Sequence, residues 1–185
     1  MSDTVKILGI SGSLRKGSYN TATLHAAIEL APPDVQIEIG DISQFPLYNA
    51  DVQAQGIPEA VQTLGAQMRA ADGVLLVTPE YNYSVSGVMK NAIDWLSRLK
   101  DQPFAGKPVA ICGASMGVLG TARAQYHLRQ IGVFLDMRIL NKPEVMIGQA
   151  HERFDANGKL VHEATRKFLG DLVAALRDHA RSFKR

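Results

Sequence analysis

The alternation of short apolar runs with longer amphipathic segments is the sequence feature that most restricts the fold. Three runs, at residues 5–10, 73–78 and 108–114, are almost continuously apolar and are closed by Gly, Pro or Ser. Such runs are typical of strands buried on both faces of a parallel sheet. A fourth run, at 35–42, alternates apolar and polar residues, which predicts a strand nearer the sheet edge. A fifth strand is predicted at 134–139.

The segments between the runs carry apolar residues at helical spacing. Residues 58–71, for example, place Val61, Leu64 and Met68 on one helical face. Helices are predicted at 20–31, 58–71, 85–99, 121–132 and 162–183. Strands that alternate with helices predict an α/β fold, in which a five-stranded parallel sheet carries helices on both faces through right-handed crossovers.

Length and charge limit the organisation of the chain and its partners. The 185 residues suffice for a well-filled core and show no linker or repeat, so we expect a single domain over residues 1–185. The formal net charge is +2, and the longest basic cluster is 181–185. No nucleic-acid partner is therefore expected. No apolar run resembles a signal peptide or a membrane span, so we expect a cytoplasmic protein without a membrane partner.

Cysteine and histidine usage argues against disulfide and metal chemistry. The only cysteine, Cys112, lies inside an apolar strand and is interpreted as a small buried hydrophobe. The five histidines show no metal-ligand spacing, so no metal site is expected.

Polar loops follow the first, third and fourth predicted strands, at residues 11–20, 79–84 and 115–120. In a parallel sheet of strand order 2-1-3-4-5, ligands bind beyond the carboxyl ends of the strands, where the order reverses between strands 1 and 3. We therefore expect the three loops to form one crevice.

The first loop, "SGSLRKGSYN", has the composition of an anion-binding turn. Gly12 and Gly17 permit close backbone approach, and the following helix directs its free N–H groups to the same place. Side-chain hydrogen bonds are available from Ser11, Ser13, Ser18 and Asn20. A simple turn with a helix cap is the alternative. Ser18 and Tyr19 stand where a triphosphate-binding loop has Lys and Ser or Thr, so a phosphomonoester is the favoured ligand.

The second and third loops suit the organic body of such a ligand. Pro79 ends the third strand, Tyr81 and Tyr83 offer flat apolar faces, and Asn82 offers an amide. Surface packing or subunit contacts are the alternative role of the two tyrosines. Backbone N–H groups of residues 115–117 are expected at the opposite edge of a ring. FMN satisfies the phosphate loop, the ring surface and the edge donors together.

Three motifs carry a resemblance to a known family. "GSLRKGSYN", "TPEYNYSVSGVMKNAIDWLSR" and "SMGVLG" resemble the NADPH-dependent FMN reductase family of the flavodoxin-like superfamily, in its quinone and chromate reductase branch. The resemblance extends from about residue 5 to residue 147. It implies a flavodoxin-like three-layer sandwich of strand order 2-1-3-4-5, FMN as cofactor, NADPH or NADH as hydride donor, and assembly into a homodimer or homotetramer. Quinones are the implied acceptors, with chromate, azo dyes and free flavins as looser ones.

The resemblance also assigns roles to single residues. It implies that Ser13, Arg15, Ser18 and Asn20 hold the phosphate, and that residues 79–82 border the ribityl chain and the ring. The cofactor-binding residues expected from the loops and the resemblance are Ser11, Ser13, Leu14, Arg15, Lys16, Gly17, Ser18, Tyr19, Asn20, Pro79, Glu80, Tyr81, Asn82, Ser115 and Gly117. No catalytic side chain is expected, because N5 of the flavin carries the chemistry.

The expected function is that of an FMN-dependent NAD(P)H:acceptor oxidoreductase in which donor and acceptor alternate at one site. The first alternative is a flavodoxin-like electron carrier reduced by a partner protein. Such carriers are usually strongly acidic, and the near-neutral charge of this chain weighs against one. The second alternative is a flavin-binding regulatory module without turnover.

Charged residues outside the loops have several interpretations. One face of the predicted helix 121–132 carries Arg123, Tyr126 and Arg129. This face has three alternative interpretations: it is exposed to solvent, it forms a subunit interface with Glu144, or it contacts a nicotinamide phosphate. Lys90 and Asp94, four residues apart on a helix, are interpreted as a weak surface pair. Trp95 is assigned to the core or to an interface.

Overall fold

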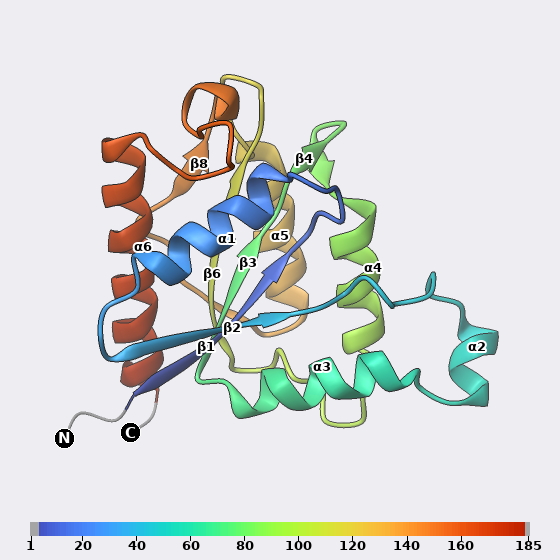
Figure 1. Cartoon of the computed structure of the whole chain (residues 1–185). Helices are drawn as coiled ribbons and strands as arrows, with labels where there is room; N and C mark the ends of the chain where they lie inside the picture. Colours follow the sequence, from blue (N-terminus) through green and yellow to red (C-terminus); the bar gives the residue numbers. More distant parts are fainter. Residues whose placement is uncertain (1–3, 184–185) are drawn as a thin grey trace.

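The computed structural model describes residues 4–183 as a parallel sheet between two helical layers (Figure 1). Residues 1–3 and 184–185, which include the ends of the predicted domain and of the basic cluster 181–185, lie outside the described part. The main sheet comprises β1 (Val5–Ser11), β2 (Val35–Gly40), β3 (Gly73–Val77), β6 (Pro108–Ala114), β7 (Arg138–Ile139) and β8 (Val145–Ile147). All its pairings are parallel, in the order β2-β1-β3-β6, and both β7 and β8 pair with β6. The predicted fold class and strand order are confirmed.

The fifth sheet position differs from its prediction. It is shared by β7, which pairs with the start of β6, and β8, which pairs with its end. The predicted strand 134–139 is wrong at its beginning, because helix α5 (Ala122–Phe134) extends to Phe134, Leu135 is its C-cap, and the chain turns at Asp136, whose φ is +51°. Leu135 packs in the core, as a strand residue would, but does so from the end of the helix.

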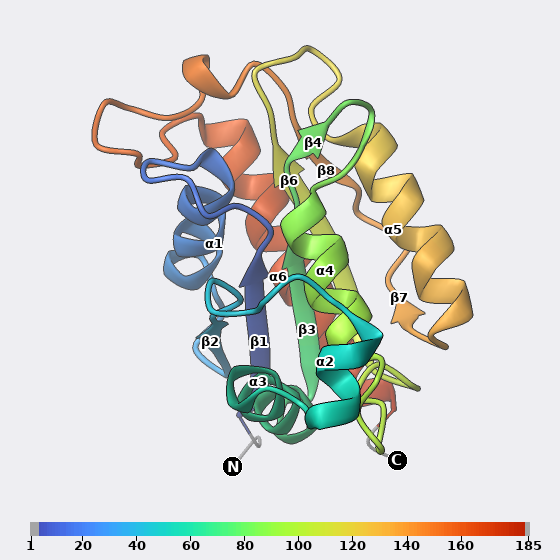
Figure 2. The same ribbon diagram turned by 90° about the vertical axis from the view of Figure 1, so that its right-hand side faces the viewer.

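Two helical layers cover the sheet. α1 (Tyr19–Glu29) and α6 (Glu163–Ser182) pack on one face around Leu24, Leu172 and Leu176. The other face carries α3 (Glu59–Ala70), α4 (Gly87–Leu96) and α5. Figure 2 shows α1 and α5 on opposite sides of the sheet. The predicted apolar face of α3 is confirmed, because Val61, Leu64 and Met68 are all buried.

Besides β8, three short elements were not predicted from the sequence. They are helix α2 (Ala50–Gln55), the hairpin of β4 (Glu80–Tyr81) and β5 (Ser84–Val85), and the 3-10 helix η1 (Ala150–Glu152). The segment before α2 is anchored at Trp95, which is fully buried and donates its Nε1–H to the carbonyl of Pro46 at 2.8 Å. Trp95 is therefore a core residue, as one of its two predicted roles required. Within residues 4–183, no helix has the length and apolar character needed to span a membrane.

Candidate functional site

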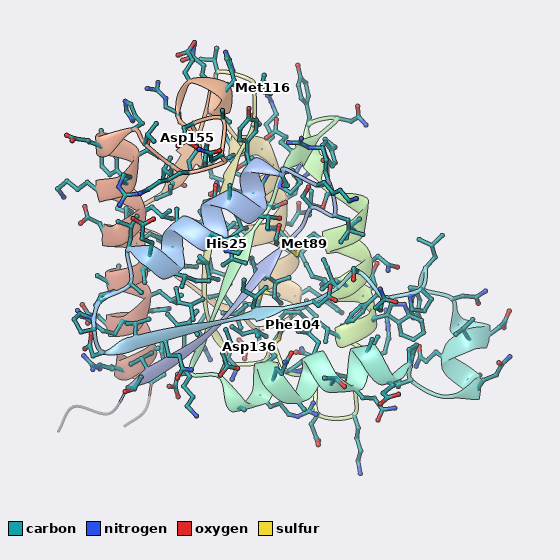
Figure 3. All side chains as sticks on the ribbon, in the orientation of Figure 1. His25, Met89, Phe104, Met116, Asp136 and Asp155 are labelled. Carbon is teal, nitrogen blue, oxygen red and sulfur yellow. The ribbon has the colours of Figure 1, made fainter. Side chains whose placement is uncertain are left out.

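The three polar loops meet at the end of the sheet where β1, β3 and β6 terminate (Figure 1). Together they line a cavity of about 880 Å³, which lies within the range of small-molecule sites. Figure 3 places Met116 of the third loop at this end of the molecule, and Phe104 and Asp136 at the opposite end. The expected crevice therefore exists in the structure.

Most of the predicted cofactor-binding residues line this cavity. They are Ser13, Arg15, Ser18, Tyr19, Asn20, Pro79, Glu80, Tyr81, Asn82, Ser115 and Gly117. The remaining four lie around it. The Ser11 hydroxyl is 3.0 Å from that of Thr21, Leu14 is exposed, and Lys16 and Gly17 line a neighbouring hollow between α1 and residues 155–160.

The first loop combines a helix cap with a set of free donors. Ser18 is the N-cap of α1, and its Oγ accepts the N–H groups of Asn20 and Thr21 at 3.2 and 3.4 Å. Within the described part of the chain, no backbone N–H of residues 13–17 donates to a protein acceptor. Arg15 forms no ion pair with a described carboxylate. The loop thus presents uncompensated donors and a cation at a helix N-terminus, which suits an anion.

Asn20 joins the first loop to the third. Its side chain is buried, its Nδ2 donates to the carbonyl of Ala114 at 2.9 Å, and its Oδ1 accepts the N–H of Ala114 at 2.9 Å. These bonds fix the start of α1 against the end of β6. The structure gives Asn20 a positioning role, and its expected contact with a phosphate stays a prediction.

Ser86 similarly joins the first loop to the second. Its buried Oγ donates to the carbonyl of Gly12 at 2.7 Å and accepts the N–H of Met89, which makes Ser86 the N-cap of α4. A side chain at Gly12 would meet Met89 and Ser86 at 3.1 to 3.2 Å, so glycine permits this close approach. The sequence analysis missed Ser86, because the predicted helix 85–99 begins two residues too early and α4 begins at Gly87.

Glu80 serves the second loop as a support for α5. Its carboxylate accepts the N–H groups of Arg123 and Ala124 at 2.9 and 3.1 Å, and Nη1 of Arg123 lies 3.3 Å away. Thr121, the N-cap of α5, makes no side-chain capping bond, so Glu80 caps this helix from another element. A ring contact of Glu80 stays a prediction. Nothing in the sequence signals its pairing with Arg123, because the two residues are 43 positions apart.

The third loop closes on itself and on β8. The Ser115 Oγ donates to the carbonyl of Gly120 at 2.6 Å, and Gly120 has a φ of +60°. The N–H of Ser115 donates to Ile147 at 3.0 Å, so β8 supports this loop. Residues that line the cavity but are absent from the predicted set are Tyr83, Ala114, Met116, Val118, Leu119, Gly120 and Arg123.

The charged residues on α4 and α5 have intrachain partners. Lys90 and Asp94 form the predicted surface pair at 2.7 Å. Arg129 lies 4.0 Å from Glu144 and donates to the carbonyl of Leu140 at 3.2 Å. Arg129 is therefore near Glu144 within one chain, and a role of this helix face in a subunit interface stays a prediction.

Metal and thiol chemistry gain no support from the described residues. No group of three or more His, Cys, Asp or Glu side chains within residues 4–183 is placed to hold a metal ion. Cys112 is fully buried, and burial raises the pKa of its thiol to about 12. The thiol is therefore protonated at neutral pH, in agreement with its interpretation as a buried hydrophobe.

Comparisons with known proteins agree on one family. A family model described as NADPH-dependent FMN reductase matches residues 5–152. The chain is 60% identical over 176 residues to an NAD(P)H-dependent FMN reductase of Pseudomonas aeruginosa, with 95% of each chain covered. It is 51% identical over 178 residues to a quinone reductase of Escherichia coli, which covers 94% of this chain and 95% of the relative. A solved structure of FerB, a flavoenzyme NAD(P)H:(acceptor) oxidoreductase from Paracoccus denitrificans, matches with a TM-score of 0.87 and 36% identity over 97% of this chain and 98% of FerB.

Proposed function

The chain belongs to the NADPH-dependent FMN reductase family, and from this premise we propose that it reduces quinones with NAD(P)H at the cavity formed by the three loops. It is an NAD(P)H-dependent oxidoreductase with FMN as its cofactor. The observation that carries the location is the convergence of a donor-rich helix N-terminus and of the second and third loops on one cavity of about 880 Å³.

The residues at the α1 end of the cavity fit a phosphate. The free N–H groups of residues 13–17, the hydroxyl of Ser13 and the Arg15 guanidinium surround the start of the helix. Hydrogen bonds to a charged group contribute about 1.5 to 3 kcal/mol each, so a few of them suffice for firm binding.

The residues at the other end fit a flat heterocycle. Tyr81 and Pro79 line the cavity from the second loop, and Met116 and Gly117 line it from the third. No described backbone N–H of residues 116–119 donates to a backbone acceptor, so these groups are available to the polar edge of a ring. Donors at that edge favour negative charge on the ring.

Bound FMN supplies a ring that accepts hydride from the nicotinamide and passes two electrons to the acceptor. The side chains bind and orient it, and we propose no protein acid or base for the transfer. We propose that donor and acceptor occupy the same open side of the cavity in turn, as a ping-pong scheme requires. Parallel lines in double-reciprocal plots would support this order, and intersecting lines would contradict it.

The proposals on secondary acceptors, cellular location and assembly are based on the family resemblance. We propose chromate, azo dyes and free flavin as secondary acceptors, a cytoplasmic location, and a homodimer or homotetramer. Val133 and Phe134 at the end of α5 are 82% and 89% exposed, which supports a subunit contact. Cell fractionation and sedimentation velocity test location and assembly.

The direct test is anaerobic mixing of FMN-reconstituted protein with NADPH or NADH, followed by a panel of quinones, chromate, azo dyes and free FMN. We expect the flavin absorbance to bleach with a nicotinamide and to return with a quinone. A protein that binds FMN but is not reduced by either nicotinamide would instead be a carrier or a regulatory module.

Removal of the Arg15 guanidinium tests the phosphate end. We expect Arg15→Ala to raise the Kd for FMN about 10- to 100-fold, because one charge-assisted interaction is lost. Riboflavin, which lacks the phosphate, serves as the matched ligand. Its affinity should be equal in the two proteins, and an equal loss for riboflavin would place Arg15 away from the phosphate. Fluorescence titration of apoprotein measures both constants.

A further inference from the structure

A second hollow lies beside the cavity, between α1 and the hairpin of residues 154–160, and we call it the α1 hollow. Its volume is about 660 Å³, which is also within the range of small-molecule sites. Figures 1 and 2 show the hairpin beside the start of α1. Figure 3 labels His25 on the helix and Asp155 on the hairpin, and both residues line the α1 hollow. The proposed function assigns no ligand to this space.

The hairpin that forms the outer wall is fixed in place by packing and by hydrogen bonds. Phe154 and Leu160 pair across its base and are both buried. The ring of Phe154 lies 5.2 Å from that of Tyr19 at the start of α1. The carboxylate of Asp155 accepts two backbone N–H groups of the turn at 2.9 and 2.8 Å. The α1 hollow is therefore already formed, and a ligand would pay little to order its walls.

The α1 hollow and the cavity meet at the N-terminus of α1. Arg15, Ser18 and Tyr19 line both spaces. The guanidinium carbon of Arg15 lies 5.7 Å from the centroid of the Tyr19 ring, at the boundary between the two. The proposed function places the phosphate of FMN at this boundary. A group attached to that phosphate would therefore continue directly into the α1 hollow.

The charges that line the α1 hollow favour a second phosphate. Arg15, Lys16 and Lys159 line it, and none of the three forms an ion pair with a carboxylate of residues 4–183. The two carboxylates that line it already have partners. Glu29 accepts a hydrogen bond from an arginine of α6 at 2.8 Å, and Asp155 accepts those of its own turn. An anion would thus meet unpaired cations and compensated carboxylates.

The rest of the α1 hollow suits a nucleoside. Ala22 and Ala26, one helical turn apart, give it a floor of small apolar side chains. The exposed side chain of His25 offers an aromatic ring on the same helix, and Asn157 offers an amide from the hairpin. A planar base with a polar edge fits these groups.

We propose that the α1 hollow is an adenylate subsite, which takes the AMP half of FAD while the FMN half occupies the cavity. The protein therefore binds the flavin dinucleotide as well as the mononucleotide. This inference rests on the proposed function, because it requires the flavin phosphate at the start of α1. The adenylate of the nicotinamide donor is a poorer occupant. FAD extends from the phosphate end, where the two spaces meet, whereas a nicotinamide has to lie at the ring end.

The test titrates apoprotein with FMN and with FAD. We expect the Kd of FAD to lie within about tenfold of that of FMN, because contacts of the AMP half offset the lost phosphate charge. Lys159→Glu should raise the Kd of FAD about 10- to 100-fold, since it places a repulsive charge beside the second phosphate. The Kd of FMN should change less than about threefold, because solvent and salt screen the more distant charge.

Two further variants control for charge and for folding. Lys159→Arg keeps the charge, so both flavins should bind within about twofold of their wild-type Kd values. Lys100→Glu makes the same change in net charge at an exposed lysine near Phe104, at the opposite end of the molecule (Figure 3). It should alter neither Kd. The apoprotein Tm of all three variants should stay within about 2 °C of the wild type, because the replaced side chains are exposed.

The donor supplies the other source of an adenylate group. The Kd of NADPH for FMN-loaded protein, obtained from rapid flavin reduction, should change less than about threefold in Lys159→Glu. A variant that loses NADPH affinity but keeps its FAD affinity would assign the α1 hollow to the donor and would overturn the inference.

The remaining outcomes separate this inference from the proposed function. A wild-type Kd for FAD more than about tenfold above that for FMN would overturn the adenylate subsite. Equal effects of Lys159→Glu on FMN and FAD would also overturn it. A protein that binds both flavins but is reduced by neither NADPH nor NADH would refute the proposed function, and the Lys159→Glu titrations would still decide what the α1 hollow binds.

Discussion

Replacement of Gly113 by alanine is expected to destabilise the protein by more than about 3 kcal/mol and to abolish FMN binding at ordinary cofactor concentrations. A Cβ atom at this position would overlap the backbone carbonyl oxygen of Thr78 and lie 2.7 Å from Oγ1 of Thr121. Neither side can yield easily, since Thr78 is hydrogen bonded through its N–H to Cys112 at 2.9 Å. β3 and β6 would have to separate where the second and third loops begin, which would disrupt the cavity.

Thermal unfolding of the apoprotein, with FMN titration of any folded material, measures this effect. At roughly 2 to 4 °C per kcal/mol for a domain of this size, a loss of about 3 kcal/mol lowers the Tm by about 6 to 12 °C. Gly87→Ala is the matched control, because a Cβ there meets no atom within 4 Å and the residue begins helix α4. It should change the free energy of unfolding by less than about 1 kcal/mol. A Gly113→Ala protein as stable as Gly87→Ala would show that β3 and β6 separate at little cost.

The alternation of strands and helices was sufficient to predict the fold class, because continuous apolar runs leave few alternatives to a buried parallel sheet. The edge position of β2 followed in the same way, and its Ile39 is 46% exposed. The strand at the fifth position of the sheet was harder to predict. Leu135, Met137 and Ile139 alternate like a strand, yet the first belongs to the end of α5 and only Ile139 pairs with β6. β8 is only three residues long, too short for periodicity to detect.

The candidate site was predictable as three loops but not as a network. Loop composition indicated which segments carry polar groups, and the topology of a parallel sheet brought them to one edge. The partners of single side chains depend on packing between segments far apart in the sequence. The sequence therefore predicted Glu80 as a ring-bordering residue, which stays a prediction, but gave no sign that it caps α5. Tyr83 was noticed for its ring, but its strained φ and its contact with Arg123 are visible only in three dimensions.

The second large effect is expected from substitution of Asn20, and its size distinguishes a positioning role of this side chain from a phosphate-binding role. We expect Asn20→Ala to destabilise the apoprotein by about 2 to 4 kcal/mol, because the buried N–H and carbonyl of Ala114 both lose their partner. A side chain whose main task were to bind phosphate would leave apoprotein stability nearly unchanged and would weaken FMN binding alone. Denaturant unfolding without cofactor distinguishes the two roles.

Two further variants sharpen this comparison. Asn20→Asp keeps the size of the side chain but has no N–H for the Ala114 carbonyl, so it should be nearly as damaging as alanine. Asn157→Ala, at an exposed turn, should cost less than about 0.5 kcal/mol. If Asn20→Ala unfolds at the wild-type denaturant midpoint, the bridge between α1 and β6 contributes nothing to stability. The first and third loops would then require another physical link.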